Sequence, residues 1–128
     1  MVVLMTRIFN RFNLLVGALG LAAAFGGGAI AARQQSPQVV TITVERFTFT
    51  PSEFKVKAGQ PVEIRLRSDD TDHGFRILDT DVNVTVPKRG KGTVNVVFEP
   101  PKPGRYAFEC SKLCGAGHAF MRGTIIAE

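Results

Sequence analysis

Hydrophobic and polar residues alternate with a period of two along most of the chain after residue 38. In the segment 62–67, apolar residues occupy the even positions and charged residues the odd ones. The same period recurs at 39–44, 47–50, 54–57 and 94–98. Successive side chains of a β-strand point to opposite faces, so each of these segments predicts a strand with one buried face.

Turn residues separate these segments at short intervals. Gly and Pro occur together at 58–61, at 87–90 and at 100–104, and further apolar stretches at 75–77, 82–86, 106–108 and 123–127 complete the series. No segment after residue 38 has a convincing helical period. About eight short strands divided by Gly/Pro turns predict an all-β fold, a Greek-key β-sandwich over residues 39–128.

The N-terminal 32 residues have a different character. Arg7 and Arg11 precede an uncharged stretch, Phe12 to Ala32, that ends in small residues. A basic start, an apolar middle and a small-residue ending are typical of a secretory signal. The stretch is also long enough to span a bilayer, so residues 1–32 are either a cleaved signal peptide or a retained membrane anchor. In both cases, with 33–38 as a polar linker, the domain is expected to be exported, in the periplasm or on the outer face of the cytoplasmic membrane.

Composition narrows the function only slightly. The chain has 128 residues and a formal net charge of +5, which is room for one compact domain besides the leader. No block of basic residues with interleaved aromatic residues is present, so nucleic-acid binding is not indicated.

The residues that indicate chemistry lie near the C-terminus. Cys110, Cys114, His118 and Met121 fall within one short segment between two predicted strands, and only one other histidine, His73, is present. Thiolate, imidazole and thioether ligands favour copper over calcium or magnesium. A mononuclear blue-copper site needs two His, one Cys and a weak Met, which leaves Cys110 in excess. A second thiolate allows two copper ions to be held, whereas the two cysteines taken alone also fit a disulfide.

This segment, with His73-Gly74-Phe75 upstream, resembles the CuA domain of subunit II of haem-copper (cytochrome c) oxidases, a domain also found in nitrous oxide reductases. The resemblance covers residues 39–128 and implies a cupredoxin fold, in agreement with the sandwich predicted above. It also implies a dinuclear copper centre bridged by Cys110 and Cys114. His73 and Met121 would complete one copper, and His118 with the backbone carbonyl of Lys112 the other.

The function implied is electron transfer, either as a soluble periplasmic carrier or as the electron-entry, subunit II-like module of a terminal oxidase. No pair of side chains resembles a catalytic nucleophile and base, so no catalytic residues are expected. The expected partner is a redox protein such as a c-type cytochrome or another cupredoxin, or an oxidase membrane subunit. Two alternatives remain: a periplasmic protein that delivers copper without redox cycling, and a cupredoxin fold whose cysteines are oxidised.

Overall fold

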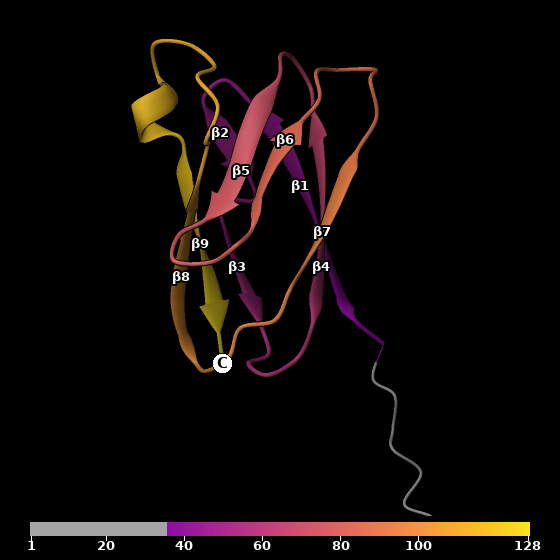
Figure 1. The fold of residues 1–128 in the computed structure, drawn as a ribbon, viewed down its shortest axis with the longest axis vertical. Helices are drawn as coiled ribbons and strands as arrows, with labels where there is room; N and C mark the ends of the chain where they lie inside the picture. Colours follow the sequence, from indigo (N-terminus) through magenta and orange to yellow (C-terminus); the bar gives the residue numbers. More distant parts are fainter. Residues whose placement is uncertain (1–35) are drawn as a thin grey trace, which may run out of the picture. The chain divides into compact units, whose positions relative to one another are not determined.

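The computed structural model describes residues 36–128, which form two stacked β-sheets (Figure 1). One sheet has the strand order β2 (Thr48–Thr50), β1 (Gln38–Glu45), β4 (Val62–Ser68) and β7 (Val94–Phe98). The other has the order β3 (Glu53–Val56), β9 (Arg122–Ala127), β8 (Gly104–Glu109), β5 (His73–Ile77) and β6 (Asn83–Val86). A single turn of 3₁₀-helix, η1 (His118–Phe120), is the only helical element within these residues.

The chain passes repeatedly from one sheet to the other. β1 pairs with β4, and β3 with β9, in parallel, while the other pairings are antiparallel. Parallel neighbours cannot be joined by a tight hairpin, so the chain changes sheet between them. The all-β sandwich predicted from the alternation is therefore confirmed.

The core lies between the sheets, where the alternating pattern places it. Val62, Ile64 and Leu66 of β4 are fully buried, and the charged residues between them point outward. Three phenyl rings, those of Phe49, Phe75 and Phe108, contact one another with centroids 5.1 to 5.9 Å apart. Because these rings come from both sheets, they join the two layers under one end of the sandwich.

Local structure differs from the sequence prediction in two places. Phe47 belongs to the turn between β1 and β2 and is only half-buried, whereas the pattern at 47–50 predicts that it shares the buried face of Phe49. The η1 turn was not predicted, because three residues are too few for a helical period.

The leader predicted at 1–32 lies outside the described residues. Between residues 36 and 128, no helix is long and apolar enough to cross a membrane.

Besides the β1–β2 turn, three longer connections meet at the end of the sandwich opposite the C-terminus (Figure 1). They are the β4–β5 loop at 69–72, the β6–β7 turn at 87–93 and the connection from Cys110 to Met121 between β8 and β9. We call the last of these the cysteine loop, and this end of the molecule the cysteine end.

Candidate metal centre

The cysteine loop is closed at its base and tightened in its second half. The N–H of Cys110 donates to the carbonyl of Met121 at 3.1 Å, which joins the two ends of the loop. Within it, the N–H of His118 donates to Gly115 O at 3.1 Å, and that of Met121 to His118 O at 3.2 Å. These bonds fold twelve residues back so that the side chains of Cys110, Cys114 and Met121 point into the sandwich and are buried.

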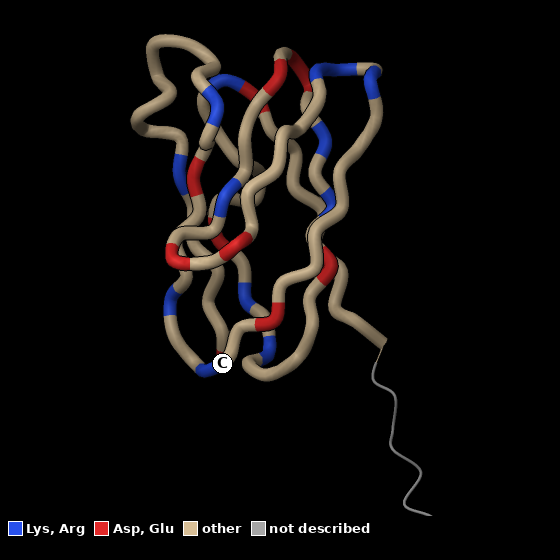
Figure 2. Tube along the Cα trace, viewed as in Figure 1, with Lys and Arg blue, Asp and Glu red and all other residues tan. Residues whose placement is uncertain are grey.

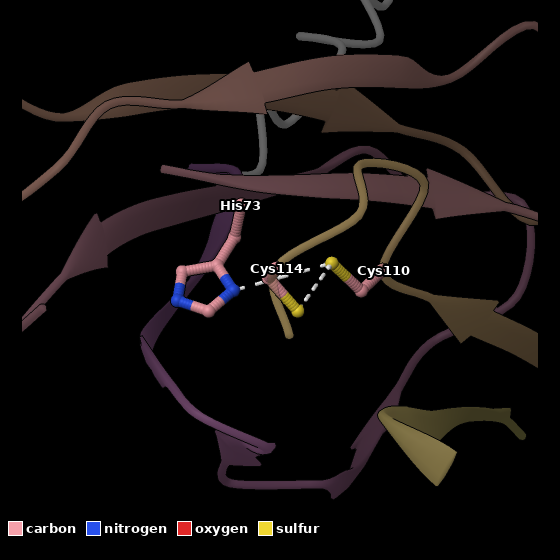
Figure 3. Close-up of side chains that lie close together, drawn as sticks. All are labelled: His73, Cys110 and Cys114. Carbon is pink, nitrogen blue, oxygen red and sulfur yellow. Dashed lines mark hydrogen bonds between the residues drawn. The ribbon is translucent and has the colours of Figure 1, made fainter. Parts of the chain in front are cut away.

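The two cysteines are free thiols in the interior of this end. Cys110 and Cys114 are 4% and 5% exposed, and their Sγ atoms lie 3.6 Å apart (Figure 3). A disulfide bond would bring the sulfurs to about 2.05 Å, so the disulfide alternative does not describe this structure. The backbone N–H of Gly74 points at the Cys110 sulfur from 3.4 Å.

His73 enters the site from β5, far from the cysteines in sequence. Its side chain is fully buried, and Nδ1 faces the Cys110 sulfur at 4.0 Å (Figure 3). The other ring nitrogen, Nε2, lies 2.7 Å from Asp70 Oδ1. A ring N–H donated to a carboxylate fixes the orientation of the imidazole and leaves the second nitrogen free to bind a metal.

Asp70 holds His73 through a small network in the β4–β5 loop. Its carboxylate also accepts hydrogen bonds from the backbone N–H of Arg46, at 2.9 Å, and from the hydroxyl of Ser68. Burial opposes ionisation of Asp70, but the hydrogen bonds from His73 and from backbone N–H groups outweigh it and lower its pKa to about 2. The carboxylate is therefore ionised at neutral pH and remains an acceptor for His73.

The remaining predicted donors surround the same two sulfurs. Nδ1 of His118 lies 3.7 Å from Cys114 Sγ, and Met121 Sδ lies 3.8 Å from the same atom. The backbone carbonyl of Lys112 approaches Cys110 Sγ at 3.1 Å. The structure thus brings all six residues singled out in the sequence to one place.

Burial affects the protonation of this group. It raises the pKa of the Cys114 thiol, with a hydrogen bond to Cys110 adding to the effect, to about 11. Without a metal the thiol stays protonated at neutral pH, and metal binding would replace that proton because the ligand is the thiolate.

The donor set fits copper better than other common metals. The side chains of His73, Cys110 and Cys114 each place a ligand atom within 4.8 Å of the others, close enough to hold one metal ion. Zinc accepts thiolates and imidazoles but seldom uses a thioether, and calcium and magnesium prefer oxygen ligands. Buried sulfur and imidazole donors held close together are typical of copper electron-transfer sites.

Two residues that support this arrangement were not identified from the sequence. Arg46 donates from Nε to the carbonyl of Cys114 at 2.8 Å. Phe47 covers Gly115 and Gly117: a Cβ added at Gly117 would lie 2.3 Å from its ring. Neither residue has a neighbour in sequence that suggests this contact, because the β1–β2 turn meets the cysteine loop only in the folded sandwich.

Comparison with known proteins gives one family. The family model described as a cupredoxin-like domain matches residues 15–127. Two sequences of cytochrome c oxidase subunit 2 from Thermus thermophilus are each 34% identical over 97 residues; the match spans 74% of this chain and 70% and 56% of those proteins.

Solved structures agree in fold. A chain of a haem-copper terminal oxidase dimer superposes with a TM-score of 0.60 at 30% identity, covering 75% of this chain and 68% of the other. The periplasmic domain of subunit II of cytochrome oxidase from Bradyrhizobium japonicum gives a TM-score of 0.66 at 18% identity, covering 73% and 86% of the two chains.

Proposed function

The chain belongs to the family of cupredoxin-like domains related to subunit II of cytochrome c oxidases, and on that premise we propose that it is a copper-binding electron-transfer protein with a dinuclear CuA-type centre. Bound copper would supply a one-electron couple, Cu(II)/Cu(I). The protein supplies the donor atoms, holds them in place and excludes water.

The observation that supports two metals is the second buried thiol. Cys110 faces Cys114 at 3.6 Å, and each sulfur has its own imidazole nitrogen and one further donor atom nearby. A single copper needs only one thiolate with two imidazoles and a thioether. We propose that both sulfurs bridge two copper ions, with His73 and Met121 completing one and His118 and the Lys112 carbonyl the other.

Metal analysis combined with electron paramagnetic resonance tests this directly. The fully loaded protein should contain two coppers per chain, and its unpaired electron should couple to both nuclei. Cys110→Ser should bind one copper with a blue-copper spectrum, because the remaining ligands form a sufficient mononuclear set. A single-copper hyperfine pattern in the fully loaded wild-type protein would contradict the proposal.

Redox cycling separates this function from copper delivery. An electron-transfer centre should keep its copper through repeated reduction and oxidation in the presence of a Cu(I) chelator. A delivery protein should lose copper to the chelator once reduced. Retention after several cycles supports the carrier, and loss in the first reduction favours delivery.

For the location and organisation of the chain, we propose a signal peptide or membrane anchor at 1–32, a linker at 33–38 and the copper domain at 39–128, exported from the cytoplasm. The similarity to subunit II sequences supports export. The mass of the purified protein distinguishes the two forms of the leader: a mature N-terminus close to Arg33 indicates cleavage, and a full-length chain released only by detergent indicates an anchor.

As partner we propose a redox protein, either a c-type cytochrome or another cupredoxin, or the membrane subunit of a terminal oxidase. Stable co-purification with a haem-containing membrane subunit would support the last of these. A chain that exchanges electrons with small proteins and purifies alone would support the carrier.

A further inference from the structure

The turn between β6 and β7 carries basic side chains that form no ion pair with residues 36–128. They are Lys88, Arg89 and Lys91. In Figure 2 they form a basic corner at the cysteine end of the sandwich. We call residues 88–91 the basic turn.

The basic turn is fixed relative to the metal site. The N–H of Lys88 donates to Asp72 Oδ1 at 2.8 Å, and the N–H of Arg89 donates to Asp70 O at 3.2 Å. Both acceptors lie in the β4–β5 loop, directly before His73. The backbone of the basic turn is therefore tied to the loop that directly precedes His73, which keeps its three basic side chains at the cysteine end.

Carboxylates at the cysteine end are mostly neutralised by other groups. Asp69 pairs with Arg67, and Asp72 pairs with Lys112. Glu109 contacts both Arg76 and Arg122. Beyond these pairs, the guanidinium of Arg46 contacts a carbonyl and keeps its full charge. Two carboxylates are left to oppose Arg46 and the basic turn: Glu45, and Asp70, which accepts from the imidazole of His73.

The opposite end of the sandwich has a more even balance of positive and negative charges. Lys55 pairs with Glu128 there, and Arg105 with Glu53. The charges that remain without an ion pair are of both signs: Asp79, Asp81, Glu99, Lys57 and Lys102. The end that carries the metal site thus has an excess of positive charge, which the opposite end lacks.

Two large apolar side chains project from the cysteine loop at the same end. Leu113, directly after Lys112, is 81% exposed, and Phe120, directly before Met121, is 85% exposed. Exposed apolar groups next to a buried redox site provide a contact that excludes water when a partner binds. We call this pair the apolar tip.

We propose that the cysteine end docks a redox protein with an acidic surface. The basic turn attracts the carboxylates of this partner, and the apolar tip contacts an apolar patch that lies among those carboxylates. This inference rests on the proposed electron-transfer function and specifies its partner. In the encounter one electron passes between the partner's centre and the copper centre, so that one is oxidised and the other reduced, and no bond is made or broken. Charge complementarity favours an acidic partner over a basic one through the association rate.

Electron-transfer rates with two small oxidants of opposite charge report the electrostatic field at this end. The reduced, copper-loaded protein is mixed in a stopped-flow instrument with ferricyanide, an anion, or with tris(phenanthroline)cobalt(III), a cation. Over a series of NaCl concentrations, the rate with ferricyanide should fall and the rate with the cobalt complex should rise, because salt screens the attraction and the repulsion. Salt dependences of the same sign for both oxidants would overturn the proposal.

A matched pair of triple variants locates the effect. Replacing Lys88, Arg89 and Lys91 by Gln should lower the ferricyanide rate at low salt by roughly threefold or more, with the copper spectrum unchanged. Replacing Lys55, Lys57 and Lys102 by Gln changes the net charge equally at the opposite end and should leave the rate close to that of the wild type. Equal losses in both variants would refute a role for the basic turn.

The apolar tip is tested with an acidic c-type cytochrome as the probe. Leu113→Ser combined with Phe120→Ser should slow electron transfer with the cytochrome about tenfold and leave the ferricyanide rate unchanged, since a small ion needs no apolar contact. No change with the cytochrome would contradict docking at the tip. If reduced protein with an intact copper spectrum passes electrons to none of these oxidants, the proposed electron-transfer function itself is wrong.

Discussion

Arg46 connects the two sides of the candidate metal centre. Its backbone N–H donates to Asp70, which holds His73, while its Nε donates to the carbonyl of Cys114. Its positive charge also acts against the burial that raises the pKa of the Cys114 thiol. A cation at this position stabilises a thiolate and disfavours the more positive, oxidised form of a bound metal.

Arg46→Gln should therefore weaken copper binding and lower the reduction potential. The backbone contact to Asp70 is kept, so His73 should remain oriented. Losing an outer hydrogen bond to a ligand residue reduces metal affinity by about 10- to 100-fold, which competition with a chelator measures, and spectroelectrochemistry gives the potential.

Arg46→Lys keeps the charge and should recover most of the potential. Arg105→Gln removes the same charge at the opposite end, where Arg105 pairs with Glu53, and should leave both quantities unchanged. If Arg46→Gln behaves like Arg105→Gln, the contact of Arg46 with the cysteine loop has no influence on the metal.

The side chain and the backbone of Lys112 have separate roles. Its carbonyl faces the Cys110 sulfur, and its Nζ lies 3.3 Å from Asp72 Oδ2 on the surface. Lys112→Ala should leave the absorption and paramagnetic spectra of the copper-loaded protein nearly unchanged, because the carbonyl remains. Loss of the mixed-valence spectrum in this variant would show that the side chain contributes to the centre.

At the scale of single residues, the sequence predicts the side chains that would bind the metal better than the residues that hold those side chains in place. Cysteine, histidine and methionine side chains bind copper through their own chemistry, so their spacing around 110–121 already indicates a site. Arg46 and Phe47 act through a contact with a loop almost seventy residues away. Nothing in the types of these residues indicates that contact.

Among the elements, β5 and the cysteine loop pack closely at Gly74. A Cβ added at this position would lie 2.2 Å from Ser111 Oγ and 2.6 Å from the backbone nitrogen of Lys112. Real Cβ atoms do not approach other atoms so closely, so the backbone at 111–112 would have to move. The absence of a side chain at Gly74 is what lets the Lys112 carbonyl lie beside Cys110.

Gly74→Ala should displace the cysteine loop and reduce copper affinity while the sandwich remains folded. Copper titration measures the affinity, and far-ultraviolet circular dichroism with thermal unfolding reports the fold. Thr85→Ala changes the residue paired with Gly74 on β6 but leaves the contact with Ser111 intact, so it should bind copper normally. Full affinity in Gly74→Ala would contradict this account of the packing.

The alternation of polar and apolar residues predicts the strands, but it predicts the turns that connect them less well. A half-buried strand repeats its pattern over several residues, and this is why β4 is clear in the sequence. The β1–β2 turn has too few residues for a period. Phe47 is therefore predicted to lie in the core, although in the structure its ring covers the glycines of the cysteine loop.

For the whole molecule, stability depends on contact between the two sheets. Leu66 is fully buried in β4, and Val97 of β7 is 66% exposed. Leu66→Ala should lower the free energy of unfolding by about 2–5 kcal/mol, because it removes buried apolar volume and leaves a cavity. Val97→Ala should change it by less than about 0.5 kcal/mol. Urea unfolding of the metal-free proteins measures both, and equal losses would mean that the burial pattern does not control stability.

His73 and Cys110 are 37 residues apart in the chain, yet their side chains face each other from different elements. A metal bound to both would act as a removable cross-link that closes a loop containing β5, β6, β7 and β8. By the chain-entropy relation for cross-links, closing a loop of that length disfavours the unfolded chain by roughly 4 kcal/mol. Each metal-loaded molecule would then resist mechanical extension between its ends at this point. Without the metal, the segment from His73 to Cys110 could be extended under force. The length of chain that unfolds under force would then depend on whether copper is bound.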